Sequence, residues 1–181
     1  MSSSDIQYFE SNNPGSSFLA ALKAVLMRPR AFFEGMPFAV FYGGSLFYAS
    51  IIVFILTFFS LPFYSLGMLF MLPFTWGSVL IGMWLISAYM SWAVKAFGGS
   101  RVSPANAFQL SAYAFTPMMF AGLSWGGIAA FVWSMALLWS GLTSYCRIGS
   151  GRAMAVIAVP LMMVGMIGGA MMFALGHLKI S

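Results

Sequence analysis

The chain has 181 residues, of which 61% are hydrophobic and only 6% are charged. Soluble domains carry about 25% charged residues, and a chain of this length exposes roughly a third of its surface after folding. The composition therefore excludes an ordinary soluble domain and predicts a membrane protein. The net charge of +5 does not indicate nucleic-acid binding, because the basic residues flank apolar runs, where membrane topology places them.

Long uncharged stretches define the predicted fold class. Residues 35–94, 102–146 and 153–178 contain no charged side chain. A helix needs about 20 apolar residues to cross the hydrocarbon layer, so the first two stretches are long enough for two crossings each and the third for one. We therefore predict an all-α, polytopic integral membrane protein with five transmembrane helices, and the lipid bilayer as its first partner.

The N-terminal part of the chain precedes the first crossing. Residues 1–17 are polar, and we expect them to be flexible. Residues 18–36 form an amphipathic segment, which Ser16 or Ser17 can cap. Its apolar positions recur at helical spacing: Phe18, Leu22, Val25 and Leu26. Aromatic rings beside basic side chains indicate a short helix on the membrane surface, although the segment also suits a simple lead-in to the first span.

The remaining residues, 37–181, form the predicted membrane domain. Its five spans are expected at about 38–61, 74–96, 104–123, 128–145 and 153–178. The apolar run from 67 to 97 is longer than one crossing requires, so we take Pro73 as a divider and expect 68–72 to be interfacial or re-entrant.

The third span is the least apolar of the five. Ser103 and Pro104 make a good helix start, with a cap residue followed by proline at the first helical position. Pro117 should kink the second half of this span. If the third span were only a surface helix, the chain would have four crossings.

The distribution of basic residues predicts the orientation. With five spans, seven basic residues lie on one side: Lys23, Arg28, Arg30, Lys95, Arg101, Arg147 and Arg152. The other side has only Lys179. The positive-inside rule then places the N-terminus in the cytoplasm and the C-terminus outside. A four-span arrangement would move Arg147 and Arg152 outward, against that rule.

The sequence offers little material for catalysis. All three acidic residues precede residue 35, so no span contains a carboxylate for proton transfer. His177 and Cys146 are the single histidine and the single cysteine, and they belong to opposite sides of the predicted membrane domain. We therefore expect no catalytic residues, no metal, no cofactor and no enzymatic activity.

Two features remain as candidate sites. Polar side chains share one face of the third span: Asn106, Gln109, Tyr113 and Thr116, followed by Pro117. They suit hydrogen bonds within the bundle or a polar path for a small solute or lipid headgroup. In the fifth span, Gly165 and Gly169 form a G-x-x-x-G pair, which suits close packing inside one bundle or a dimer seam.

Three local patterns coincide along the chain. The lead-in to the first span contains Arg28-Pro29-Arg30-Ala31-Phe32-Phe33, and the third span contains Tyr113-Ala114-Phe115-Thr116-Pro117. Later, Trp139, Gly141 and Leu142 precede Arg152-Ala153 and Pro160. In this order the patterns resemble the Yip-one-type membrane domain family, named for Ypt/Rab-interacting proteins, and specifically its short bacterial branch.

The resemblance implies a five-span helical domain with a cytoplasmic N-terminus. Eukaryotic members of the family look like partners of small GTPases in vesicle traffic. This sequence lacks their long cytoplasmic N-terminal region and their acidic aspartate-leucine-tyrosine-glycine-proline motif, so we do not expect it to bind a small GTPase. Bacterial relatives include companions of export machinery, so the resemblance implies an accessory membrane subunit.

Three functions follow as hypotheses. The first is a non-enzymatic scaffold or accessory subunit that binds other membrane proteins, or a second copy of itself, through its helix faces and its basic surface. The second is a transporter or channel for a small uncharged or amphipathic solute or lipid, which would use the polar face of the third span. The third is a membrane-shaping role of the amphipathic segment.

Overall fold

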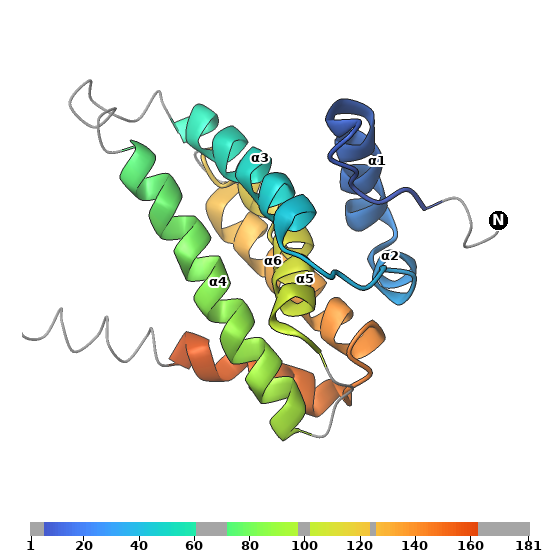
Figure 1. Cartoon of the computed structure of the whole chain (residues 1–181). Helices are drawn as coiled ribbons and strands as arrows, with labels where there is room; N and C mark the ends of the chain where they lie inside the picture. Colours follow the sequence, from blue (N-terminus) through green and yellow to red (C-terminus); the bar gives the residue numbers. More distant parts are fainter. Residues whose placement is uncertain (1–5, 61–71, 98–101, 124–125, 163–181) are drawn as a thin grey trace, which may run out of the picture.

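The computed structural model describes residues 6–60, 72–97, 102–123 and 126–162, and these residues form helices joined by short connections (Figure 1). The helices are α1 (Pro14–Met27), α2 (Pro29–Glu34), α3 (Gly43–Ser60), α4 (Leu72–Ala96), α5 (Pro104–Ala114), the 3-10 helix η4 (Thr116–Phe120), α6 (Gly126–Ser144) and a further helix, Ser150–Met162. No strand occurs within the described ranges, so the all-α prediction is confirmed for them.

Three of these helices, α3, α4 and α6, are long and apolar enough to cross a membrane. They correspond to the first, second and fourth predicted spans. α3 begins at Gly43 rather than near residue 38, because the backbone before it is held by a side chain: the N–H of Ala39 donates to Oδ1 of Asn106 at 2.6 Å. α4 begins at Leu72 and includes Pro73 in its first turn, where the missing N–H costs no intrahelical bond. The stretch from 68 to 71 lies outside the described residues.

The third predicted span is broken into two pieces. α5 ends at Ala114, and η4 continues from Thr116 to Phe120. Pro117 cannot donate the backbone hydrogen bond that the carbonyl of Tyr113 would receive in an α-helix. Oγ1 of Thr116 donates to that carbonyl instead, at 2.6 Å. The interruption thus lies where the proline predicted a kink, and its form is a change from α-helix to 3-10 helix.

α5 occupies the centre of the bundle. It packs against α3, α4 and α6, and nine of its eleven residues are buried. A helix surrounded by protein can carry more polar side chains than a helix that faces lipid, because its neighbours supply hydrogen-bond partners. This position explains why the third span is the least apolar.

Contacts along α3 fix the direction of α5 and η4. Asn106 bonds to the residues before α3, Thr116 lies beside Tyr48, and Gly122 lies against the end of α3 at Ser60. The chain from α5 to Gly122 therefore runs parallel to α3 over its whole length. α6 then returns in the opposite direction, with Gly141 against Leu110.

The N-terminal segment covers one side of this bundle (Figure 1). The sequence suggested that its apolar face could rest on lipid, but the structure buries that face against protein. The buried residues of α1 and α2 are Ser17, Phe18, Ala21, Val25, Phe32 and Phe33. α1 also begins earlier than expected, at Pro14, so Ser16 and Ser17 lie inside the helix and do not cap it.

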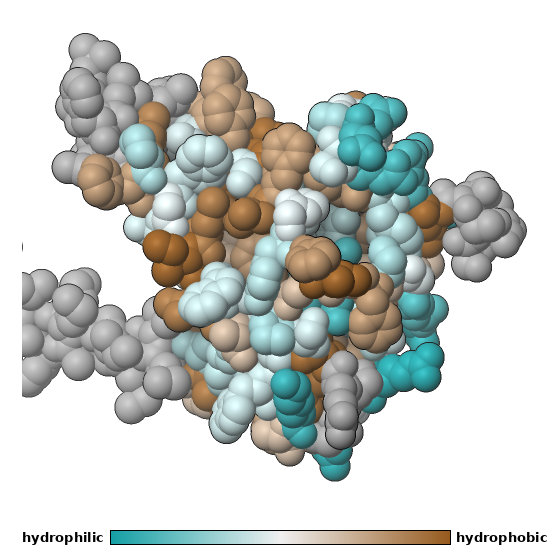
Figure 2. All heavy atoms as spheres, in the orientation of Figure 1, coloured by the Kyte–Doolittle hydropathy of each residue, from teal (hydrophilic) through white to brown (hydrophobic). Residues whose placement is uncertain are grey.

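The surface separates into two kinds of region. In Figure 2, the most hydrophilic residues gather over the N-terminal segment and the lower end of the bundle, while α3 and α4 carry hydrophobic residues mixed with residues of near-neutral hydropathy. Large apolar side chains on these outward faces include Phe54 on α3, Trp84 on α4 and Val132 on α6. This pattern is that of a bundle whose flanks face lipid.

Candidate functional site

The polar face of the third span meets α3 through a chain of hydroxyl groups. Oη of Tyr48 and Oγ1 of Thr116 are 2.9 Å apart, and both residues are completely buried. Because the Thr116 hydroxyl proton is donated to the carbonyl of Tyr113, Tyr48 must be the donor in this pair. These two hydroxyl groups thus supply the hydrogen bond that the Tyr113 carbonyl cannot receive from Pro117.

Tyr113 connects the same face to the N-terminal segment. Its hydroxyl oxygen accepts a hydrogen bond from the N–H of Phe9 at 3.3 Å. Its ring centroid lies 4.7 Å from that of Tyr48 and 4.8 Å from that of Phe32. Edge-to-face and tilted aromatic pairs at these separations are favourable beyond the area they bury. The centre of the bundle therefore holds the N-terminal segment in place.

More aromatic rings extend this junction. The ring of Phe18 lies 5.3 Å from that of Tyr48, and the ring of Phe9 lies 5.5 Å from it. We call the five rings of Phe9, Phe18, Phe32, Tyr48 and Tyr113 the aromatic junction. Three of them come from the segment before the first span, so the junction joins that segment to α3 and α5.

Tyr8 forms a further contact within the N-terminal segment. Its hydroxyl donates to the carbonyl of Phe32 at 3.0 Å, and its ring lies 4.9 Å from the ring of Phe32. Burial raises the pKa of Tyr8 above the ordinary tyrosine value. A Cβ at Gly35 would lie 2.7 Å from the Tyr8 hydroxyl, so a larger residue there would have to displace the Tyr8 side chain.

The remaining polar residues of the third span also face protein. Oδ1 of Asn106 accepts from Ala39, as described above, and its N–H donates to the cap residue Ser103 at 3.2 Å. Oε1 of Gln109 is buried and accepts no hydrogen bond from the described residues. Asn106, Tyr113 and Thr116 therefore each hydrogen-bond to a different segment of the same chain.

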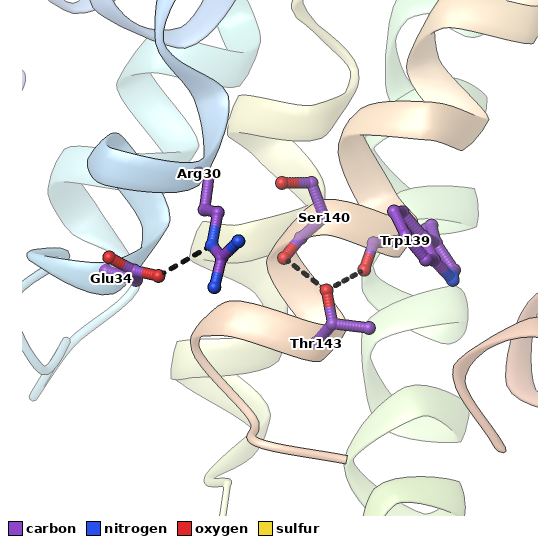
Figure 3. A network of polar contacts seen from close by, with 5 residues as sticks. All are labelled: Arg30, Glu34, Trp139, Ser140 and Thr143. Carbon is purple, nitrogen blue, oxygen red and sulfur yellow. Dashed lines mark hydrogen bonds and ion pairs between the residues drawn. The ribbon is translucent and has the colours of Figure 1, made fainter. Parts of the chain in front are cut away.

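Four of the seven predicted basic residues lie at one end of the bundle, and Arg101 lies outside the described residues. Nε of Arg30 lies 2.9 Å from Oε1 of Glu34, and the Arg30 side chain extends from α2 toward Ser140 of α6 (Figure 3). An Arg152 guanidinium N–H donates to the carbonyl of Phe97 at 2.8 Å, close to Lys95 at the end of α4. Arg147 and Glu34 line one cavity. We call this end, with Arg30, Lys95, Arg147 and Arg152, the basic end.

The other predicted residues have separate positions. Lys23 is exposed on α1, and Arg28 is the exposed residue between α1 and α2. Thr143 uses its hydroxyl within α6, where it donates to the carbonyls of Trp139 and Ser140 (Figure 3). Gly165 and Gly169 lie outside the described residues.

Nothing in the described part of the chain resembles a metal site or an activated nucleophile. No group of three or more His, Cys, Asp or Glu residues comes together within it. Cys146 is buried just after α6, and burial raises the pKa of its thiol to about 12. A thiol with this pKa is not a nucleophile at neutral pH.

Sequence reasoning overlooked several residues of the aromatic junction and of the helix contacts. Phe9 stands in a stretch that was expected to be flexible, yet its N–H and ring contact the bundle. Gly122, which the sequence analysis did not single out, lies at a close contact, because a Cβ there would lie 3.0 Å from the carbonyl carbon of Phe59. The signal that could have identified Phe9 is the pair of aromatic residues at positions 8 and 9 in an otherwise polar stretch.

Comparison with known proteins gives one match. The family model described as the Yip1 domain matches residues 23–172, which is most of the chain and includes α5, α6 and the basic end. No curated protein and no solved structure matches the chain.

Proposed function

Because this chain belongs to the Yip1 domain family, we propose that it is a non-enzymatic integral membrane scaffold or accessory subunit that acts by binding other membrane proteins. The role would be of the membrane-trafficking or export-complex type. The expected partners are other membrane proteins or a second copy of the chain, and no small GTPase is included among them.

The observation that carries this proposal is the internal use of the polar groups in the third span. Asn106, Tyr113 and Thr116 hydrogen-bond to other segments of the same chain. The chemistry that is left to face outward is the basic end and the apolar flanks of α3, α4 and α6. Such surfaces suit docking of membrane proteins rather than conversion of a substrate.

The same observation argues against the transporter hypothesis. A polar path along the third span would need its polar side chains to line a water-filled or solute-filled space. Thr116 is completely buried, Asn106 is 3% exposed, and Tyr113, one of the rings of the aromatic junction, is buried as well. We therefore do not retain transport as the second candidate function.

We also propose the five-span topology in a bacterial inner membrane, with a cytoplasmic N-terminus and an outside C-terminus. α5 and η4 together rise about 26 Å, close to the roughly 27 Å of α3, which they follow from one end to the other. Spans one and three are then parallel, and spans two and four return. This arrangement puts Arg30, Lys95, Arg147 and Arg152 on one side, as the positive-inside rule requires. The fifth span would begin in the helix Ser150–Met162.

Photo-crosslinking of the full-length protein in its native membrane tests the scaffold proposal. A photoreactive amino acid would replace one exposed residue at a time: Lys23 on α1, Phe54 on α3 or Val132 on α6. A partner that uses one surface should give a discrete protein adduct at one position and not at the other two. The silent positions serve as matched controls for expression and for nonspecific capture.

The opposite outcome is equally clear. Adducts with lipid alone at all three positions, together with a monomeric protein after gentle detergent extraction, would contradict the scaffold proposal. The same adduct at every position would show capture of abundant neighbours and would also count against a specific partner.

A further inference from the structure

A polar cavity at the basic end has no role in the function proposed above. It has a volume of about 520 Å³, within the range of small-molecule sites, and it lies where α2 approaches the end of α6. We propose that this cavity binds the headgroup of an aminophospholipid, which is a phosphate diester that carries a primary ammonium.

Three residues of the cavity lining suit the phosphate. Arg147 is one of them, and its guanidinium has no hydrogen-bond partner within the described ranges. Tyr145 is the second, and its buried hydroxyl is also without a partner in the described part of the chain. A guanidinium presents a planar set of donors that matches phosphate oxygens, and a phenol adds a further donor. Ser144 is the third, with a hydroxyl that can donate.

The backbone at Arg147 supports a binding role. Arg147 has a φ of 53°, and it is the one described residue other than glycine with a positive φ. A left-handed conformation is unfavourable for a residue with a Cβ, and such conformations concentrate at binding sites. The chain keeps an arginine at 147 although glycine occurs at 149 and 151 in the same loop. The strain therefore accompanies a charged side chain directed to a cavity.

The opposite charge on the cavity wall selects the class of ligand. Glu34 lines the same cavity, and Arg30 contacts its Oε1 through a single N–H. A simple anion would be repelled by the Glu34 carboxylate, and a simple cation would be repelled by Arg147. A zwitterion satisfies both residues, with its phosphate toward Arg147 and its ammonium toward Glu34.

The rest of the lining indicates that the ligand is a lipid rather than a soluble ester. Met36, Phe38 and Val102 are the apolar residues of the lining. Phe38 is 73% exposed, and Phe41, further along the same connection to α3, is 82% exposed. Exposed apolar residues beside a membrane span face lipid, so the cavity opens where an acyl chain can continue from the headgroup.

Native mass spectrometry of the full-length protein tests the proposal directly. The protein would be exchanged into detergent with equal amounts of phosphatidylethanolamine, phosphatidylcholine and phosphatidylglycerol that share the same acyl chains. We expect phosphatidylethanolamine adducts to exceed each of the others by at least threefold. The preference arises because a trimethylated ammonium cannot donate a hydrogen bond to Glu34 and a glycerol headgroup has no cation.

Variants separate the two halves of the site. Arg147→Gln should reduce adducts of all three lipids, whereas Glu34→Gln should abolish only the preference for phosphatidylethanolamine. Lys23→Gln removes a cation of the same charge on exposed α1 and serves as the matched control, with adducts like those of the unaltered protein. Circular dichroism of each variant checks that the helices are retained.

The outcomes that overturn the proposal are specific. Equal adducts of the three lipids, or an Arg147→Gln variant with the adducts of the unaltered protein and unchanged helicity, would exclude this site. Competition with millimolar free phosphoethanolamine tells whether the ligand is a membrane lipid or a soluble ester. If the free compound displaces no lipid, the result supports a membrane lipid. If it displaces the lipid completely, the lipid assignment is overturned in favour of a soluble ester. The crosslinking test of the scaffold proposal probes residues that do not line this cavity, so each proposal can fail alone.

Discussion

Tyr48 on α3 donates a hydrogen bond to Thr116 at the start of η4, with 2.9 Å between the two hydroxyl oxygens. This contact lies at the point where the central helix of the bundle changes from α-helix to 3-10 helix. The hydrogen bond joins the break in the third span to α3, so the break is stabilised by packing against a neighbouring span.

The first prediction concerns this hydrogen bond. Tyr48→Phe leaves Oγ1 of Thr116 without its donor and should lower the free energy of unfolding by about 1 kcal/mol. Thermal unfolding of the purified protein in detergent, followed by circular dichroism, measures the change. Tyr89→Phe is the matched control, because Tyr89 is only partly buried and its ring is tilted against that of Trp92, with 6.2 Å between the centroids. An equal effect of both substitutions would contradict the assigned role of Tyr48.

The second prediction concerns the close approach at Gly122. A Cβ at this position would meet the backbone of Phe59 and Ser60 at 3.0 Å, and backbone atoms cannot move aside as a side chain can. Gly122→Ala should therefore lower the melting temperature. Gly82→Ala in α4 provides the comparison, because nothing lies within 4 Å of a Cβ there and alanine favours the helix. A Gly122→Ala protein as stable as the Gly82→Ala protein would exclude close packing at this turn.

The third prediction concerns the docked N-terminal segment. Phe18→Ala removes a buried ring from the aromatic junction and should weaken docking by about 3 kcal/mol. Trypsin should then cleave faster after Lys23 and Arg30, whereas Arg28 is followed by proline and resists cleavage. Leu19→Ala changes the neighbouring residue, which is 63% exposed, and should leave the cleavage rate unchanged. Equal rates for the two variants would show that the segment is not held by this ring.

The fourth prediction concerns the thiol of Cys146. Burial raises its pKa to about 12, so at pH 8 the thiolate is rarer than in an ordinary cysteine by a factor on the order of a thousand. Maleimide should label the folded protein slowly and the denatured protein fast. Because the folded state favours the neutral thiol, this contribution to stability is complete below about pH 8.5 and is lost as the pH rises toward 12. A Lys23→Cys variant without Cys146 should label quickly at pH 8, and fast labelling of native Cys146 would refute its burial.

The fifth prediction uses the positive φ of Arg147. Arg147→Gly and Arg147→Ala both remove the guanidinium, but only glycine accepts a φ of 53° without strain. The glycine variant should therefore be more stable than the alanine variant by about 1 kcal/mol, while both lose lipid adducts. Thermal unfolding and native mass spectrometry together give the comparison. An alanine variant of equal or greater stability would show that the loop relaxes.

The parts of the fold that face lipid were the easiest to predict. Lipid demands long, uncharged helices, so the uncharged stretches located α3, α4 and α6 within a few residues of their observed ends. Proline chemistry located the break in the third span for a similarly local reason. The bundle's centre was harder, because the partners of its polar face come from distant positions such as Phe9 and Ala39.

The amphipathic segment shows a second limit of sequence reasoning. Helical spacing of Phe18 and Val25 indicates an apolar face, but it does not tell whether lipid or protein covers that face. Here the cover is protein, and the rings of Tyr48 and Tyr113 form much of it. The cavity at the basic end was also beyond prediction, since Glu34 and Arg147 are more than a hundred residues apart.

The separation of 104 positions between Phe9 and Tyr113 in the sequence imposes an order on the biogenesis of this protein. A ribosome that adds about 5–20 residues per second exposes the N-terminal segment for about 5–20 s before α5 has been synthesised. During that interval the apolar face of α1 has no protein surface to cover it, and the nearby bilayer is the natural substitute. The part of the chain that is made first thus completes its folding only after the third span has been inserted.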